Sequence, residues 1–370
     1  MFKSLTPPHY ESGKMRSVEA ARALAAFAVV LMHAANLMRV EHFSGHIGLA
    51  GVFDFGYVGV DFFFVLSGFI ITYVHFSEIG QVGRIPPYLW RRFSRIYPIF
   101  WVILLLSIAI TTLGRFASGK GLSFDIAASD IAGTVFLLMG DGEPKYVGVA
   151  WSLQYEVVFY VAFCILLTSA RVGAIAFGTW AIFLLARALG LVQIDLPIGL
   201  DSPHCLQFLL GVMVGAAARR YTLRTSLMTL RVVLLAFVAT VLFEVSGPFG
   251  SHSAEGRIAL GLASAAVLAT LVALENGRAI ATPAWLARMG SVSYSIYLGH
   301  ILFINLTYMV LLKLGIYHAL PEVVVFTIAI SVALTTTTLI GRYIELPLVA
   351  KLKERKGAID DIVPRSAVGR

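Results

Sequence analysis

Charged residues are scarce in this chain. Of its 370 residues only 14% are charged and 58% are hydrophobic, whereas an ordinary soluble domain carries about a quarter charged residues. Apolar runs close to the roughly 20 residues needed to cross a bilayer recur along the whole length. A soluble core cannot absorb so many of these runs. The sequence therefore predicts an all-α, polytopic membrane protein.

Cysteines are equally rare, and a cleavable leader is not expected. The two cysteines, Cys164 and Cys205, both lie in apolar runs, so we expect no disulfide framework and interpret them as unreactive packing residues. The opening over 1–16 is polar and too long before the first apolar run to resemble a signal peptide. Internal repeats, low-complexity tracts and a stretch long enough for a soluble domain are missing too. Any chemistry must therefore be performed by the membrane-spanning core.

Ten membrane-spanning helices are expected from the apolar runs. The predicted spans are 17–39, 56–76, 95–113, 149–169, 172–190, 203–219, 231–247, 257–274, 292–312 and 322–344. The segment 126–140 is weakly apolar and short. We interpret it as an interfacial or re-entrant piece rather than a crossing.

The distribution of lysine and arginine predicts the orientation. With a cytoplasmic N-terminus, 20 of these residues fall in inside segments and six in outside segments, as the positive-inside rule expects. An eleventh crossing at 126–140 would move the four arginines between 219 and 231 outside, so ten crossings with both termini cytoplasmic fit better. The net charge of +8 is then explained by topology and attraction to anionic lipid, not by nucleic acid. The expected organisation is a cytoplasmic segment at 1–16, a transmembrane domain at 17–346 and a basic cytoplasmic tail at 347–370.

Arg22 and His33 are the first candidates for function, because an ionisable side chain inside a span is costly unless it is paired. They are eleven residues apart, which is about 20° from a whole number of turns, so they share one helix face at a separation of roughly 16 Å. A guanidinium near the cytoplasmic end and an imidazole in the outer half suit a long donor whose phosphates trail inward. The alternative is an arginine that extends to the interface and a histidine bonded to a backbone carbonyl.

Two carboxylates are predicted to lie at the depth of His33. Asp61 in the second span and Glu156 in the fourth both fall a few residues below the outer surface. A carboxylate on one imidazole nitrogen would fix the tautomer and raise the basicity of the other nitrogen, which prepares a general base. Ser67, deeper in the second span, is either a nucleophile or, as we favour, a small residue that permits close helix packing.

Three arginines, Arg91, Arg92 and Arg95, cluster at the predicted start of the third span. One interpretation is charge that sets the topology. The other is a phosphate clamp, because the planar guanidinium fork matches phosphate oxygens.

Other polar residues are weaker candidates. Trp151 is equally explained as an interfacial anchor, and Glu345 is interpreted as structural. Further possible site residues are Ser152, Tyr294, Tyr297 and His300, the last three expected in the inner half of the ninth span.

No metal site is predicted. His42 and His46 are four residues apart but lie in an outside loop without a convincing third ligand. Asp141, Glu143 and Lys145 are interpreted as a solvated loop on the acceptor side.

Taken together, these residues resemble the acyltransferase-3 family of membrane O-acyltransferases. The resemblance rests on six stretches in one order, from about residue 16 to residue 350: Arg22-(ten residues)-His33, YVGVDFFFVLSGFIIT, RRFSRIYPIF, WSLQYEVVFY, SYSIYLGH and YIELPL. The usual acidic doublet after WSL is here Tyr155–Glu156, so one acid of the two remains. The extracytoplasmic esterase-like domain of some members is not expected, so the membrane domain would complete transfer alone or with a partner protein.

The resemblance implies a bacterial inner-membrane enzyme that takes acetyl-CoA, or a related acyl-CoA, from the cytoplasm. It implies acceptors among the sugars of exopolysaccharide, lipopolysaccharide or lipid-linked oligosaccharides, and possible polysaccharide-assembly partners. The arginine–histidine motif carries over to Arg22 and His33, and the RR-x-x-R motif to the arginine cluster.

The mechanistic hypothesis is that the arginines hold the donor phosphates while His33, oriented by Asp61 or Glu156, deprotonates a sugar hydroxyl. Direct transfer is simpler, and a covalent intermediate on Ser67 or His33 stays open. The main rival is a secondary transporter or proton-coupled flippase, which also needs intramembrane ionisable residues but predicts an inverted repeat that we do not find. An inactive scaffold would be expected to lack the Arg22–His33 pair, which is present.

Overall fold

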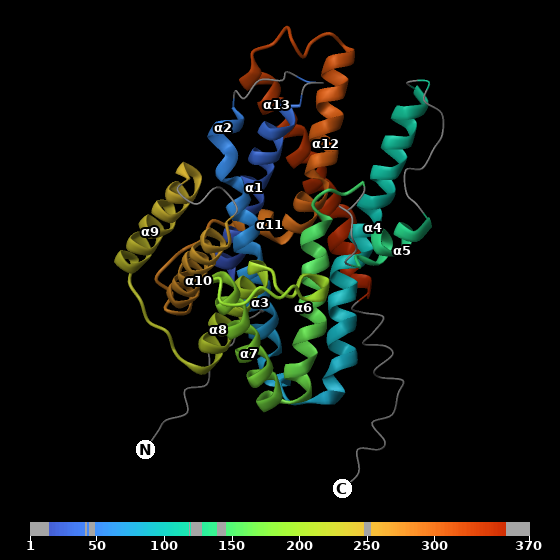
Figure 1. Cartoon of the computed structure of the whole chain (residues 1–370). Coiled ribbons are helices and arrows are strands. Elements are labelled where there is room, and N and C mark those ends of the chain that lie inside the picture. The colour runs from blue at the N-terminus through green and yellow to red at the C-terminus, as the bar shows by residue number, and fades with distance from the viewer. Residues whose placement is uncertain are drawn as a thin grey trace.

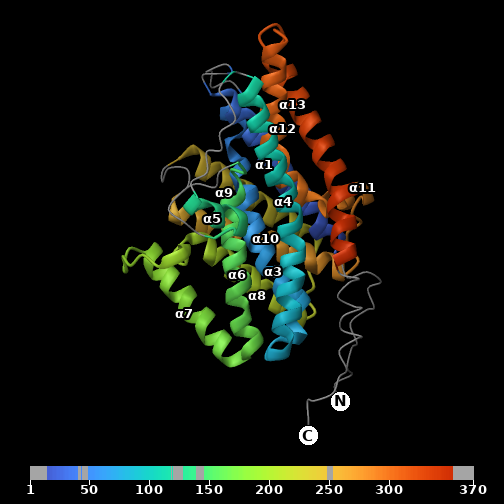
Figure 2. The same cartoon turned by 90° about the vertical axis from the view of Figure 1, so that its right-hand side faces the viewer.

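The fold is a bundle of helices (Figures 1 and 2). A computed structural model describes residues 15–40, 43, 49–117, 119, 128–138, 146–247 and 253–352. All regular secondary structure in these segments is helical, which confirms the all-α prediction. Nine helical runs in this part of the chain are long and apolar enough to cross a membrane. The protein is therefore a polytopic membrane protein, as predicted.

The long helices match the ten predicted spans in order. They are α1 (Arg16–Met38), α3 (Val58–His75), α4 (Ile85–Ala117), α6 (Ala150–Thr168), α7 (Ala170–Ala188), α8 (Pro203–Arg220), α9 (Leu227–Ser246), α10 (Ala254–Asn276), α12 (Ser293–Lys313) and α13 (Glu322–Ile340). Shorter elements are α2 (Ala50–Phe53), η1 (Asp54–Tyr57), η2 (Phe76–Glu78), η3 (Val82–Arg84), α5 (Ala128–Phe136), η4 (Pro197–Gly199), α11 (Ala284–Ser291) and the π-helical η5 (Gly341–Glu345).

Two elements qualify the expected count of crossings. The helix α8 lies at its predicted position but is not among the nine candidate spans, since its polar first turn and terminal arginines lower its hydropathy. The helix α5 has nine residues, which is about 14 Å of rise and too short to cross a bilayer. Its end is fixed by Tyr97 and Trp101 of α4, which donate to the carbonyls of Phe136 and Val135.

Helix α4 begins ten residues before its predicted start. Pro86 and Pro87 lie in its first turn, where proline is tolerated because those N–H groups have no intrahelical partner. A helix boundary based on hydropathy alone does not detect this start signal. The arginine cluster, expected at the start of the span, consequently lies one to three turns inside the N-terminal end of the helix.

Close packing of small residues places the central helices. A Cβ atom on Gly68 of α3 would lie 2.0 Å from the Phe208 carbonyl oxygen of α8, and one on Gly211 of α8 would lie 1.8 Å from that of Val65. The backbones of α3 and α8 therefore touch, as in membrane helix pairs built on small residues. Gly59 lets α3 approach α1 in the same way.

The centre and the edge of the bundle differ in burial. Helix α1, rich in alanine, lies in the middle and buries most of its length (Figure 1). Its first turn is capped by Glu275 of α10, which accepts hydrogen bonds from the backbone N–H groups of Arg16 and Ser17. In α9, at the edge of the bundle, only Glu244 is buried. An apolar helix exposed in this way is suited to face lipid.

Candidate active site

A cavity between α1, α3, α4, α6 and α12 brings together most of the predicted site residues. About 760 Å³ of space lies between its lining atoms, and this figure includes space open to solvent. Its polar lining consists of Arg22, Ser67, Arg92, Arg95, Ser152, Glu156, Tyr160, Ser293, Tyr294 and Tyr297. Apolar side chains of α3, α4 and α6 form the remaining walls.

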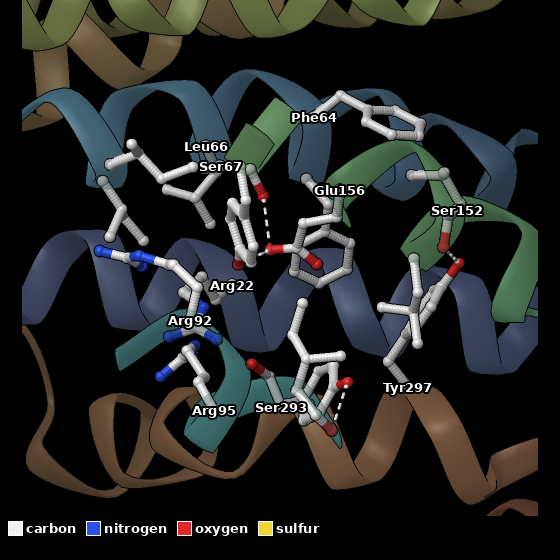
Figure 3. Close-up of a pocket in the computed structure, with 18 residues that line it drawn as sticks. Arg22, Phe64, Leu66, Ser67, Arg92, Arg95, Ser152, Glu156, Ser293 and Tyr297 are labelled. Atoms are coloured by element: carbon white, nitrogen blue, oxygen red, sulfur yellow. Dashed lines mark hydrogen bonds between the residues drawn. The ribbon is translucent and has the colours of Figure 1, made fainter. Parts of the chain in front are cut away.

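Three guanidinium groups gather at one end of the cavity (Figure 3). Arg22 is buried and pairs with Glu19, one turn earlier in α1, at 3.1 Å. Arg92 is also buried, and its guanidinium lies over the rings of Tyr88 and Tyr160. No carboxylate of the described residues lies within ion-pair distance of Arg95. Of the three, only Arg22 has a carboxylate within ion-pair distance among the described residues, so guanidinium N–H groups remain available for an anion.

Arg92 and Arg91 form hydrogen bonds with a histidine and a glutamate that the sequence interpretation missed. His75, at the end of α3, is almost wholly buried, and its Nε2 atom lies 2.6 Å from Nη2 of Arg92. Its Nδ1 atom lies 2.7 Å from a carboxylate oxygen of Glu78. Arg91 donates to the same carboxylate at 2.8 Å and does not line the cavity. Only two of the three clustered arginines thus face the expected anion.

Glu156 lies in the middle of the cavity rather than beside His33. Its carboxylate accepts hydrogen bonds from the hydroxyls of Tyr160 at 2.6 Å and Ser67 at 3.3 Å (Figure 3). Since Ser67 follows Asp61 by six residues on α3, Glu156 lies about 9 Å deeper than Asp61. The prediction of one common depth for these carboxylates is wrong, and so is the expected contact of Glu156 with His33.

Asp61 is also at a different depth from His33. Gly59 packs against Ala25 and Val29 of α1, so Asp61 faces about position 25 of that helix. His33 lies about eight residues, or roughly 12 Å, further along. The predicted pairing fails because α2 and η1 extend the apolar run of α3 to Gly51, so Asp61 is further from its outer end than the predicted boundary implied.

The partners of Asp61 come from α8 and α10. Arg257 donates to both oxygens of the fully buried carboxylate at 2.8 Å, and Gln207 donates to one of them at 2.6 Å. His204 is bonded to Gln207 in turn. The sequence signal for this cluster was available, because Gln207 and His204 are polar residues inside a predicted span. Asp61 is thus part of a buried ion pair between helices.

His33 is paired with His300 of α12. Its Nδ1 atom lies 3.0 Å from the carbonyl oxygen of Val29 and 3.1 Å from Nε2 of His300. His300 was expected in the inner half of its span. It reaches the level of His33 because α11 packs against α1 at Glu19, so α12 begins inside the bundle rather than at its face.

The end of the cavity opposite the arginines is formed by α6 and α12. Ser152 and Tyr297 are joined there by a hydrogen bond of 2.8 Å between their hydroxyls (Figure 3). One helical turn beyond Tyr297 on α12 lies His300. Trp151 packs against Phe64 and has its ring centroid 5.4 Å from that of His204.

Two further residues of the closing motifs contact the backbone. Tyr294, which lines the cavity, donates to the carbonyl oxygen of Ile96. Glu345, in the π-helical turn, accepts from the N–H and the hydroxyl of Ser295, a contact of the structural kind expected for it.

Some predictions fall outside the described residues: those for His42 and His46, and the loop containing Asp141, Glu143 and Lys145. Among the residues that are described, no group of three histidine, cysteine or acidic side chains could hold a metal ion. Cys164 and Cys205 are both free thiols.

The structure is thus a helical bundle around a cavity lined by arginines at one end, with His300 and His33 beyond its other end. The sequence profile of the acyltransferase-3 family, described as an acyltransferase domain, matches residues 15–342. The chain belongs to this family.

Two curated relatives are similar over part of the chain. The exopolysaccharide production protein ExoZ of Rhizobium meliloti is 27% identical over 264 residues, which cover 67% of this chain and 76% of ExoZ. The peptidoglycan O-acetyltransferase OatA of Listeria monocytogenes is 29% identical over 162 residues, which cover 41% of this chain and 24% of OatA. No solved structure gives a significant match.

Proposed function

We propose that this protein is an O-acyltransferase that moves an acyl group, acetyl by default, from cytoplasmic acyl-CoA to a hydroxyl of a cell-surface or lipid-linked saccharide. One observation carries the proposal: the cavity has its guanidinium groups at one end and reaches Ser152 and Tyr297 at the other. His300, with its partner His33, follows one turn beyond Tyr297. The arginines provide for an anionic carrier, and the histidines, which lie beyond the residues that line the cavity, provide a proton acceptor.

The donor end fits the phosphates of acyl-CoA. Arg22, Arg92 and Arg95 present planar forks to the cavity, and such forks bind phosphate oxygens in bidentate fashion. The walls between the arginines and Tyr297 are mostly apolar, with Phe63 and Leu153 among them. An extended pantetheine arm can lie along such walls without leaving many polar groups unpaired.

The acyl transfer itself is assigned to His33. Its Nε2 takes the proton of the acceptor hydroxyl while the hydroxyl oxygen attacks the thioester carbonyl carbon. The carbon–sulfur bond then breaks, an ester is formed, and the leaving thiolate receives the proton from the imidazolium. This is general base and then general acid catalysis by one side chain. Asp61 has no part in it, and Glu156 acts within the cavity, through Ser67 and Tyr160, rather than on His33.

A saccharide acceptor is supported by the two relatives, whose names refer to exopolysaccharide and to peptidoglycan. For the site to join a cytoplasmic donor to such an acceptor, the arginine end must face the cytoplasm. We therefore propose a bacterial inner-membrane protein with both termini cytoplasmic. This orientation can be tested with single cysteines introduced at Ser169, near the arginine end, and at Gly315. Each variant is labelled with a maleimide that does not cross the membrane. Only the second should react in intact cells.

The direct test is acyl transfer by the purified protein in lipid nanodiscs, from radiolabelled acetyl-CoA to a saccharide acceptor. We expect label in the saccharide with the wild type and none with His33→Ala, which should insert normally. A wild-type rate in that variant removes His33 from the mechanism.

Substrate uptake into sealed vesicles, without consumption of acyl-CoA, would support the transporter instead. A labelled protein trapped on acid quenching would contradict direct transfer, and Ser67→Ala would show whether Ser67 carries the group.

A further inference from the structure

The contacts of the two imidazoles define a single arrangement of protons. Nδ1 of His300 lies 3.1 Å from the carbonyl oxygen of Ile296, four residues earlier in α12. Nδ1 of His33 lies 3.0 Å from the carbonyl oxygen of Val29, four residues earlier in α1. A carbonyl oxygen can only accept a hydrogen bond. Both Nδ1 atoms must therefore carry the proton when the rings are neutral.

The same arrangement explains the contact between the rings. With its proton on Nδ1, His300 has a bare Nε2, and this atom lies 3.1 Å from Nδ1 of His33. The Nδ1–H of His33 is thus shared between the Val29 carbonyl and the lone pair of His300. Nε2 of His33 is left without a proton. No hydrogen bond to it is formed by the described residues.

The burial of the pair favours a neutral partner over a carboxylate. His300 is fully buried, and its ring centroid lies 6.0 Å from that of Tyr297. A carboxylate at this place would have to stay ionised in apolar surroundings while His33 is neutral, which is costly. A neutral imidazole avoids that cost. It also accepts a stronger hydrogen bond once His33 becomes positively charged.

We propose that His300 is the positioning residue of the reaction: its Nε2 lone pair, together with the Val29 carbonyl, holds His33 in the Nδ1–H tautomer, so that the Nε2 of His33 serves the acceptor hydroxyl as the base. The inference rests on the proposed function, because it assigns His33 the proton transfer. It gives to a second imidazole the role that a carboxylate has in many catalytic histidines.

Two substitutions at position 300 separate the lone pair from the packing. In His300→Gln the side-chain oxygen can accept from the Nδ1–H of His33, whereas His300→Leu fills similar space with no acceptor. We expect the leucine variant to lose roughly 100-fold in kcat, the range of general base catalysis. Its KM for acetyl-CoA should stay within about twofold, because Arg22 lies roughly 16 Å from His33 along α1. The glutamine variant should recover most of the lost rate.

Controls and spectroscopy complete the design. His318→Leu, on the connection between α12 and α13, replaces a histidine outside the pair and should keep the wild-type kcat. Selective ¹⁵N-histidine labelling of the wild type in nanodiscs reports the tautomers directly, with His33→Ala and His300→Gln used for assignment. We expect Nδ1–H on both rings. An Nε2–H tautomer at His33 would overturn the role of His300 even if the leucine variant does not fold.

The outcomes separate a failure of this inference from a failure of the proposed function. Full transfer by His33→Ala would overturn the proposed function. Loss of transfer in that variant, together with an unchanged kcat in His300→Leu, would overturn only the role of His300. Equal losses in the leucine and glutamine variants, or an Nε2–H tautomer at His33, would also overturn it, since a lone pair at position 300 would then be irrelevant.

Discussion

The Nη1 atom of Arg257 lies 2.8 Å from each oxygen of Asp61, and this pair joins α10 to α3 in the interior of the protein. Asp61 has no exposed surface, and its second partner, Gln207, also donates to the backbone carbonyl of Arg257. A charge buried in this way is retained only while its partners remain. The pair is thus a structural connection between three helices.

Removal of the Asp61 carboxylate should therefore cost stability before it costs chemistry. We expect Asp61→Ala to lower the free energy of unfolding by about 3–5 kcal/mol, the usual result of breaking a buried ion pair from one side. Thermal unfolding in detergent measures the loss. The double variant Asp61→Leu/Arg257→Leu should be less destabilised than the single one. A loss of kcat in Asp61→Asn without any fall in Tm would contradict this role.

Arg95 should contribute to donor affinity and not to the chemical step. Its guanidinium lines the cavity without an ion-pair partner among the described residues, and a hydrogen bond to a charged group is worth about 1.5–3 kcal/mol. We expect Arg95→Ala to raise KM for acetyl-CoA by about 10- to 100-fold, with little change in kcat. Acetyl-pantetheine, which lacks the nucleotide phosphates, serves as control substrate. An equal rise in KM for both substrates would show that Arg95 does not bind phosphate.

The sequence predicted the helices well because each apolar run must satisfy its own backbone in a membrane. It also indicated Arg22, Arg92, Arg95 and Glu156 as candidate site residues, because an ionisable residue is rare within a span. These four line one cavity, although Glu156 was expected nearer His33. What could not be predicted was the depth of each residue.

Depth along a span depends on where the helix begins relative to its neighbours, which hydropathy does not define. The run that contains Asp61 starts at Gly51 and α12 starts inside the bundle, so the carboxylate shifted away from His33 and His300 shifted toward it. The rotation of each helix about its own axis could not be predicted from the sequence either. Without it, neither the contact of His75 with Arg92 nor that of Asp61 with Arg257 could be inferred.

His75 should position Arg92 for the donor. Its Nε2 accepts from Arg92 and its Nδ1–H donates to Glu78, so a side chain with an acceptor at the Nε2 position is needed. We expect His75→Leu to raise KM for acetyl-CoA about tenfold, the loss of one charge-assisted hydrogen bond, and His75→Gln to restore most of the affinity. Gln81→Ala, on the following turn, should have no effect. A fall in kcat at unchanged KM would place His75 in the chemistry instead.

The contact of α3 with α8 should be intolerant of a single methyl group. A Cβ atom on Gly211 would lie 1.8 Å from the carbonyl oxygen of Val65, and backbone cannot yield as a flexible side chain does. We expect Gly211→Ala to lower Tm and to cost about 1–3 kcal/mol, as overpacking does. Gly178→Ala, on α7 with nothing within 4 Å of the new atom, is the matched control and should be neutral or stabilising by about 0.5–1 kcal/mol. Because α3 carries Ser67 into the cavity and Asp61 into the ion pair, a separation of α3 from α8 would disturb both. An unchanged Tm in Gly211→Ala would mean that the two backbones are not in contact.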